Sequence, residues 1–310
     1  MPNFQFYQLD VFTETPFCGN PLAVFPDGTG ISVDKMQQIA REMNLSETVF
    51  VLPSDKPEAL RRLRIFTPTK ELPIAGHPVG GTWNLLARLG FIENAPRDGA
   101  IEIQHELGVG VLPVEIHFSD GQPSKVTMTQ GKFIAGEVVR DPKILATIAE
   151  AFNFTLADFA SDAPVQTAGI GVDFTIIPVR SLNILKNCRA NSAKLAELPK
   201  TFPGEFSLFT RETLEENSTI HTRMFAPEFG ITEDPATGSA AGAIGGYLVQ
   251  HNLLKKELSV EGIFKFTIEQ GDFINRPSRI AVEITGTSNN VEKVRVGGAA
   301  IIVAKGDIFL

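Results

Sequence analysis

Most apolar positions along the chain are spaced as in β-strands. In the first part of the sequence, Met36, Ile39 and Met43 are the exception, because they recur at helical spacing behind Ser32, a residue typical of helix N-caps. A second helix is expected from the Gly- and Pro-rich turn at 73–78 to about residue 89. Alternating or short continuous apolar runs predict strands at residues 4–12, 22–25, 48–52, 61–66, 101–104, 108–112 and 114–118.

The second part of the chain follows a similar plan. A turn at 120–123 marks the expected boundary, and the last strand is assigned to the first domain because it has no other obvious partner. We therefore predict one domain of residues 1–120 plus 292–310 and a second of residues 121–291. The elements predicted after the boundary are strands at 125–129, 175–178, 205–209, 218–225, 264–269, 280–285 and 293–303, and helices at about 142–152 and 239–251.

The sequence contains an internal repeat. Residues 64–68 (Arg-Ile-Phe-Thr-Pro) recur as residues 223–227 (Arg-Met-Phe-Ala-Pro), and after a small difference in length residues 73–77 align with residues 235–239. Two unrelated turns that share Gly and Pro are the alternative explanation. Because the alignment extends into both following helices, we predict two structurally similar halves, with their helix starts facing a common cleft.

Both helices that follow the repeated segments are poor in polar side chains. The helix at 239–251 includes Ala240, Gly242, Gly245 and Gly246. Glycine in a helix interior costs about 1 kcal/mol relative to alanine, so this composition needs a compensating gain. A helix without a polar face is a buried helix, and we expect a sheet to curl closely around each of the two.

The starts of these two helices are candidate binding sites for an anion. Gly76 and His77 begin one helix, and Gly238 and Ser239 begin the other. A helix N-terminus offers free backbone N–H groups and the positive end of the helix dipole, so it binds a carboxylate or a developing oxyanion. Ordinary helix capping explains either start alone, whereas the pair favours a small carboxylated substrate.

Two carboxylates and one histidine are candidates for acid–base chemistry. Glu47 lies between the first helix and an apolar strand, and Asp234 stands where the other half of the repeat has Leu72. A partly desolvated carboxylate acquires a raised pKa and then serves as acid and base. His77 is a third candidate, as a donor or a proton holder. The alternatives are a solvated strand-start residue, an Asp-Pro turn residue and a satisfied polar group, respectively.

Composition and charge narrow the possible functions. Of the 310 residues, 43% are hydrophobic and 21% are charged, as in a globular protein. A net charge of −8 argues against nucleic acid or an anionic membrane as partner, and no apolar stretch has the length of a membrane-spanning helix. Two cysteines, Cys18 and Cys188, fit a reducing compartment, so we expect a cytoplasmic location.

Common cofactor and metal motifs do not occur in the sequence. The Gly-rich segments at 108–110 and 169–171 lack the third glycine and the following helix of a dinucleotide site. The five histidines form no close pair of metal ligands, and neither a P-loop nor a serine nucleophile elbow is present. We therefore expect no cofactor and no metal.

Several segments together resemble the PhzF family, over nearly the whole chain and in the family's order. This resemblance implies an α+β, diaminopimelate-epimerase-like fold with two pseudo-symmetric domains, each a curved sheet wrapped around a central helix. It also implies a homodimer. The segments that carry it are residues 19–24, 45–50, 64–68, 71–73, 75–78, 233–240, 269–271 with 276–278, and 296–298.

The resemblance also implies an activity, which is isomerisation by general acid–base catalysis without a cofactor. The family's member in phenazine synthesis isomerises 2,3-dihydro-3-hydroxyanthranilate by moving a hydrogen along a conjugated system. Its catalytic glutamate falls on Glu47, and its supporting polar residues fall on His77, Asp234 and Ser239. The residues expected to bind substrate are Ser46, Gly76, Gly238 and Ser239.

Two other functions stay open beside an isomerase that uses Glu47. Related epimerases place a cysteine before each central helix, where this chain has Ala75 and Thr237, and Cys18 lies instead in the turn after the first strand. Racemisation by two thiols is therefore not expected. An epimerase or racemase in which Glu47 and Asp234 act from opposite faces is the first alternative, and a non-catalytic binder of small molecules is the second.

Overall fold

The computed structural model describes residues 2–199, 202–227 and 230–310. Its contacts divide the chain into two compact units, which we call unit 1 (residues 1–129 with 297–310) and unit 2 (residues 130–296). No helix within the described residues has the length and apolar content needed to cross a membrane.

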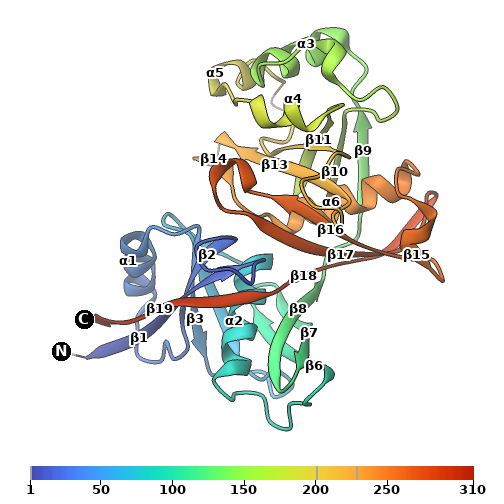
Figure 1. The fold of residues 1–310 in the computed structure, drawn as a ribbon. Helices are drawn as coiled ribbons and strands as arrows, with labels where there is room; N and C mark the ends of the chain where they lie inside the picture. Colours follow the sequence, from blue (N-terminus) through green and yellow to red (C-terminus); the bar gives the residue numbers. More distant parts are fainter. Residues whose placement is uncertain (1, 200–201, 228–229) are drawn as a thin grey trace. The chain divides into compact units, whose positions relative to one another are not determined.

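Unit 1 is a curved sheet that encloses one helix. Strand β1 pairs antiparallel with both β2 and the C-terminal strand β19, which runs beside it in red in Figure 1. The last strand of the chain thus belongs to the sheet of unit 1. The elements of unit 1 are β1 (Asn3–Val11), β2 (Asn20–Phe25), α1 (Val33–Met43), β3 (Glu47–Leu52), β4 (Arg62–Phe66), β5 (Glu71–Leu72), α2 (Gly76–Arg88), β6 (Gly99–Leu107), β7 (Gly110–Ser119), β8 (Gln122–Thr129) and β19 (Ala300–Phe309).

Helix α2 is the enclosed element of unit 1. It contacts β1, β2, β3, β8 and β19. The sheet approaches so closely that a Cβ on Gly81 would lie 2.6 Å from Cδ2 of Leu22 and 2.7 Å from Cγ2 of Val11. The close approach of β1 and β2 therefore explains why position 81 is glycine, where an exposed helix would have alanine.

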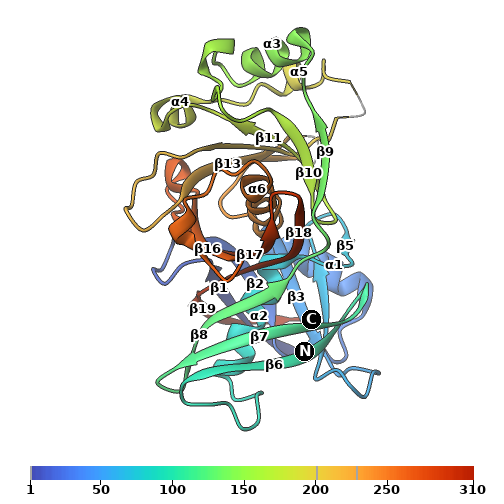
Figure 2. The same cartoon turned by 90° about the vertical axis from the view of Figure 1, so that its right-hand side faces the viewer.

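Unit 2 repeats this architecture around α6 and adds a second helical layer. Helix α6 contacts β10, β11 and β17, and Figure 2 shows it nearly end-on inside the curve of the sheet. The elements of unit 2 are β9 (Ile134–Val138), α3 (Pro142–Ala151), β10 (Gln166–Gly169), β11 (Asp173–Pro178), α4 (Leu182–Asn187), α5 (Ser192–Leu195), β12 (Phe206–Thr210), β13 (Ile220–Ala226), β14 (Ile231–Asp234), α6 (Gly238–Gln250), β15 (Ser259–Val260), β16 (Ile263–Gln270), β17 (Ser278–Thr287) and β18 (Asn290–Gly298), with short 3₁₀ turns at Leu156–Asp158, Lys256–Leu258 and Asp272–Ile274.

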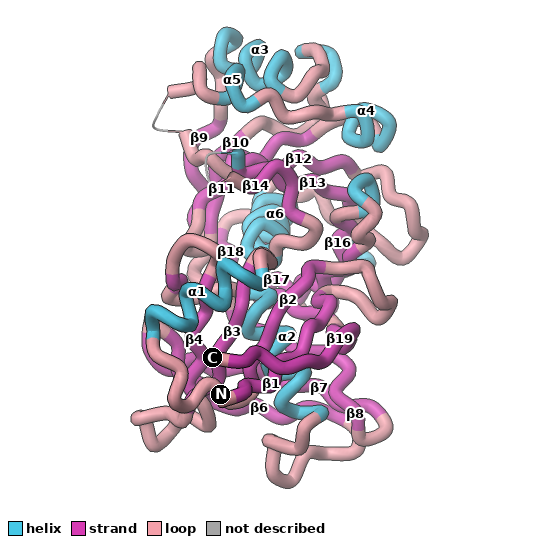
Figure 3. The backbone as a smooth tube through the Cα atoms, turned by 90° about the vertical axis from the view of Figure 1, so that its left-hand side faces the viewer, coloured by secondary structure: helices cyan, strands magenta, loops and turns pink. Residues whose placement is uncertain are grey.

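The additional layer consists of α3, α4 and α5, which lie on the side of β11 and β12 away from α6 (Figures 1 and 3). Phe152, Leu185 and Leu195 of this layer form one apolar cluster with Ile177 and Leu208 of the strands. A strand that is covered on both faces has no exposed side, and all five residues of β12 are accordingly buried.

The internal repeat is confirmed in the pairing of the strands. In unit 1, β2 runs parallel to β3, β3 and β5 each pair antiparallel with β4, and β4 runs parallel to β6. In unit 2, β11, β12, β13, β14 and β16 pair in the same order and directions. Both α2 and α6 have 13 residues and begin at the matched glycines. The predicted α+β class, with a curved sheet around a central helix in each half, is therefore confirmed.

Some predicted boundaries differ from the structure. The strands expected at 108–112 and 114–118 are one strand, β7, because β8 pairs with β7 only from Val114 onward and the missing N–H of Pro113 costs no bond on that side. The strand expected at 293–303 is divided into β18 and β19. The contact boundaries fall after residues 129 and 296, and not after 120 and 291, because β8 extends the sheet of β6 and β7.

Two adjacent glycines of α2 test the close packing. A Cβ on Gly80 meets no described atom within 4 Å, whereas a Cβ on Gly81 meets two buried side chains. We expect Gly80→Ala to stabilise the protein by about 0.5–1 kcal/mol and Gly81→Ala to destabilise it by about 1–3 kcal/mol. Urea unfolding of both variants measures the difference. Equal stability of the two would contradict the enclosure of α2.

Candidate active site

Unit 1 brings two of the predicted catalytic residues together. Glu47 is the first residue of β3, paired opposite Leu22 of β2, and His77 is the second residue of α2. Nε2 of His77 lies 3.1 Å from Oε2 of Glu47, with side chains 8% and 15% exposed. The carboxyl group is therefore held at the start of a helix and is largely withdrawn from water.

The burial of His77 determines its charge. Burial lowers the pKa of His77 to about 3, because water no longer solvates the imidazolium form. At neutral pH the ring is uncharged, so it is a polar neighbour of Glu47 and not a counter-ion. Nε2 of His77 makes no hydrogen bond of good geometry with any described residue, so the 3.1 Å approach to Glu47 is a close polar contact.

The N-terminus of α2 has unoccupied donors next to this pair. Its N-cap is Ala75, and no described side chain caps the first backbone N–H groups. A Cβ built on Gly76 would meet no described atom within 4 Å, so there is space for a ligand to approach the backbone. Ser46, which directly precedes Glu47, is half-buried. Unit 1 thus combines a carboxyl group, a neutral imidazole and free N–H donors.

Unit 2 holds the remaining predicted residues within one short segment. Asp234 is the last residue of β14, and Gly238 and Ser239 begin α6 after the N-cap residue Thr237. The hydroxyl group of Thr237 donates to Oδ2 of Asp234 instead of capping the helix. Ser239 is half-buried and Gly238 is buried. As in unit 1, a carboxylate accompanies a helix start without a side-chain cap, and in unit 2 the two are also close in sequence.

Ion pairs that were not predicted from the sequence stabilise both turns. Arg64 donates twice to Glu71 at 2.7 and 2.6 Å, and Arg223 donates twice to Glu233 at 2.9 and 2.6 Å. Each arginine also lies over the phenylalanine two residues further on. Paired guanidinium and carboxylate groups of this kind fix geometry as well as charge. The signal was present, because both partners recur at matched places in the repeat.

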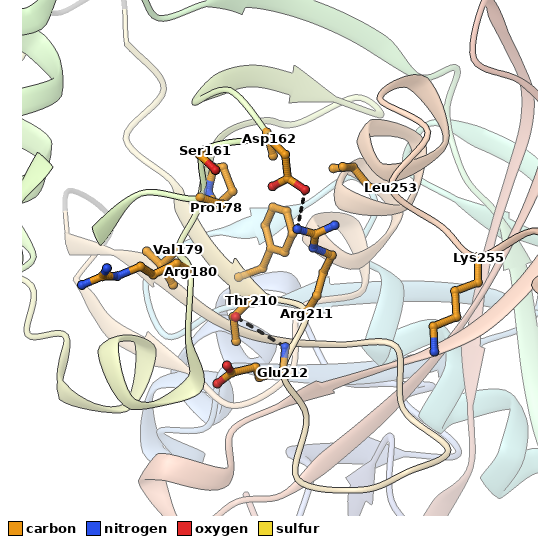
Figure 4. Close-up of a pocket in the computed structure, with 13 residues that line it drawn as sticks. Ser161, Asp162, Pro178, Val179, Arg180, Thr210, Arg211, Glu212, Leu253 and Lys255 are labelled. Atoms are coloured by element: carbon orange, nitrogen blue, oxygen red, sulfur yellow. Dashed lines mark hydrogen bonds and ion pairs between the residues drawn. The ribbon is translucent and has the colours of Figure 1, made fainter. Parts of the chain in front are cut away.

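A separate surface pocket of about 590 Å³ lies in unit 2 and includes none of the predicted site residues. Figure 4 shows Arg211 directed at Asp162, and these two side chains form an ion pair of 2.5 Å. Arg180, on the same rim, pairs with Asp158 at 2.8 Å. Both arginines are thus paired with carboxylates, and Lys255 is a third cation that lines the pocket.

Comparison with known sequences gives one consistent family. A model of the phenazine biosynthesis-like protein family (PhzC-PhzF) matches residues 9–306. An uncharacterised isomerase of Clostridium acetobutylicum is 34% identical over 308 residues, covering 99% of this chain and 98% of the relative. Trans-2,3-dihydro-3-hydroxyanthranilate isomerase of Pseudomonas aeruginosa is 32% identical over 303 residues, covering 97% and 98%, respectively.

Solved structures agree with this result. A Bacillus anthracis phenazine biosynthesis protein of the PhzF family has a TM-score of 0.88 at 25% identity and covers 100% of both chains. A hydroxyproline epimerase from Agrobacterium vitis, with bound trans-4-hydroxy-L-proline, has a TM-score of 0.65 at 13% identity and covers 99% of this chain and 91% of its own. The second likeness concerns the fold alone.

The buried His77 predicts a pH dependence of stability. Its pKa is about 3 in the folded protein, whereas an imidazole that is not buried has a pKa of 6.5. Between these two pH values the unfolded chain therefore binds a proton that the folded chain does not. Stability attributable to His77 is therefore complete above pH 6.5 and falls by about 1.4 kcal/mol per pH unit below it. Urea unfolding at pH 6.5 and 5.0 should show a smaller loss in His77→Gln than in wild type.

His105 provides the control for this measurement. Burial lowers its pKa to about 4, so it contributes a similar slope from outside the candidate site. His105→Gln should also reduce the loss between pH 6.5 and 5.0, and the double variant should reduce it further. An unchanged slope in His77→Gln would contradict a neutral, buried imidazole.

Proposed function

Because the chain belongs to the phenazine biosynthesis-like (PhzF) family of isomerases, we propose that it moves a proton within a small carboxylated substrate through Glu47. The observation that carries the proposal is the placement of Glu47. Its carboxyl group is 15% exposed, lies 3.1 Å from a neutral imidazole and belongs to the same unit as an uncapped helix start. These are the parts that cofactor-free proton transfer needs.

The proposed reaction has two proton transfers. Glu47, as a carboxylate, takes a proton from an acidic C–H of the substrate, and the electron pair of that bond moves into the adjoining unsaturated or carboxylate system. Glu47, now a carboxylic acid, returns the proton at a different carbon. Substrate and product have the same composition, so the reaction consumes no oxidant, reductant or second substrate.

The start of α2 stabilises the anion formed between the two transfers. The backbone N–H groups of Gly76 and His77, which the side chain of the N-cap residue Ala75 does not cap, are donors that need not reorganise when the negative charge develops on the substrate. His77 is a close polar neighbour of Glu47 that adds no charge. A cation in its place would hold Glu47 in a buried ion pair and make it a weaker base, so the neutral form suits the proposed role.

We propose that the candidate residues of unit 2 bind the substrate. Asp234 accepts a hydrogen bond from an amino or hydroxyl group of the substrate, and Ser239 with the N–H groups at Gly238 binds a polar or anionic group. The half-buried positions of Asp234 and Ser239, beside the uncapped start of α6, support these roles. That both helix starts act on one ligand stays a prediction, as do the homodimer and the cytoplasmic location.

An epimerase that uses Glu47 and Asp234 as its two bases is the alternative chemistry, since each half supplies one carboxyl group. The two reactions differ in product. Isomerisation shifts a double bond, whereas epimerisation inverts a stereocentre and leaves the bonding unchanged. Proton NMR and chiral chromatography of the product distinguish them.

The substitution Glu47→Gln tests the assigned role. Wild type and variant are incubated in heavy water with trans-2,3-dihydro-3-hydroxyanthranilate and a panel of small amino and hydroxy acids, and products are analysed by mass spectrometry. We expect deuterium uptake or rearrangement with wild type and a loss of about 10²–10⁴-fold in rate with Glu47→Gln, because the amide cannot accept the proton.

Glu42→Gln, an exposed glutamate on α1, is the matched control and should keep full activity. Full activity of Glu47→Gln would refute the assignment. Thermal stabilisation of wild type by a panel compound, without any solvent exchange or conversion, would instead favour a non-catalytic binder.

A further inference from the structure

A buried glutamine holds the segment that carries Asp234. Gln270, the last residue of β16, has no exposed surface. Its Nε2 donates to the backbone oxygen of Asp234 at 2.7 Å and to Oγ1 of Thr237 at 3.1 Å, and its Oε1 accepts from the backbone N–H of Thr237 at 3.1 Å. One side chain therefore forms hydrogen bonds with both ends of the turn from Asp234 to Thr237.

These partners determine which atom donates in each hydrogen bond between Gln270, Thr237 and Asp234. The N–H of Thr237 requires an acceptor and the carbonyl of Asp234 requires a donor, so the amide of Gln270 has only one orientation. Nε2 then donates to Oγ1 of Thr237, and the single hydroxyl proton of Thr237 is left for Oδ2 of Asp234. Asp234 is thereby held as a hydrogen-bond acceptor at this oxygen.

The other half of the repeat lacks all three polar groups. At the position of Asp234 unit 1 has Leu72, at that of Thr237 it has Ala75, and at that of Gln270 it has Leu107. The last match follows from the pairing of Arg62 with Glu106, which corresponds to that of His221 with Glu269. Since unit 1 folds the same turn without them, the fold does not require the amide and the hydroxyl.

The same turn also has contacts with Ser278 and Gly271. Oγ of Ser278 donates to the backbone oxygen of Pro235 at 2.9 Å. Gly271 has a φ of +82°, and a Cβ there would lie 2.5 Å from that oxygen. The turn thus has supports of its own, and what Gln270 adds through Thr237 is the orientation of one carboxylate.

We propose that Gln270 is a positioning residue, which acts through Thr237 to hold Asp234 as a fixed acceptor for a hydrogen-bond donor on the substrate. A carboxylate has about four acceptor sites and can accept from a ligand while it accepts from Thr237. The substrate class is accordingly a small carboxylate with an amino or hydroxyl group. This inference rests on the proposed function.

The first test needs no substrate. Gln270→Met keeps the length and removes both donors and the acceptor, so the amide N–H of Thr237 should exchange with solvent faster, by about 10-fold or more. In Gln270→Glu the acceptor remains, so that amide stays protected, but the hydroxyl of Thr237 is drawn to the new carboxylate. Gln166→Met, another buried glutamine in unit 2, is the control and should leave the exchange at Thr237 unchanged. Unchanged exchange in Gln270→Met would overturn the inference.

The second test measures kinetics with the compound that wild type converts. Gln270→Met and Thr237→Val should each raise KM and lower kcat/KM by about 10- to 100-fold, with a smaller effect on kcat, because Asp234 binds the substrate in ground and transition states alike. Thr237→Ser, which keeps the hydroxyl, should restore most of the loss. The double variant should be no worse than Thr237→Val.

The outcomes separate this inference from the proposed function. If the losses of kcat/KM in Gln270→Met and Thr237→Val added up in the double variant, Gln270 would not act on Asp234 through Thr237. A loss confined to kcat would contradict the inference as well. If kcat/KM fell equally in Gln270→Met and Gln166→Met, Gln270 would have a merely structural role, and the inference would be overturned. Failure of wild type to convert any compound would count against the proposed function alone, since amide exchange at Thr237 still tests the hydrogen bond to Gln270 on which the positioning depends.

Discussion

Two helices with few polar side chains are largely enclosed by a sheet, and this constraint organises both halves of the molecule. Glycines such as Gly81 and Gly245 allow the sheet to approach each helix to contact distance, with Val282 the nearest neighbour of the latter. Once the sides of a helix are covered, its uncapped N-terminus is the part that remains for a ligand. Fold and candidate chemistry therefore have a common physical origin.

The two halves share this plan and differ in the groups around the helix start. Unit 1 has Glu47 beside a neutral His77, an arrangement suited to taking up and releasing a proton. Unit 2 has Asp234 tied to Thr237, an arrangement suited to accepting hydrogen bonds.

Much of this arrangement was predictable, because it depends on local signals. The repeat indicated two similar halves, and residue 47 stood out as a carboxylate before an apolar strand. The role of Gln270 was not predictable, since its partners at 234 and 237 are distant in the sequence and a single strand glutamine has no periodic signature. The continuity of β7 through Pro113 was missed because it depends on where a neighbouring strand ends.

The central claim is that one carboxyl group takes a proton from the substrate and returns it elsewhere. The most direct measurement follows a deuterium label placed on the carbon that loses its hydrogen, in a single turnover of the converted compound in ordinary water. The account predicts that part of the label appears at the new C–H position of the product. A product whose new hydrogen comes entirely from solvent, at the earliest times measured, would contradict transfer by Glu47 alone.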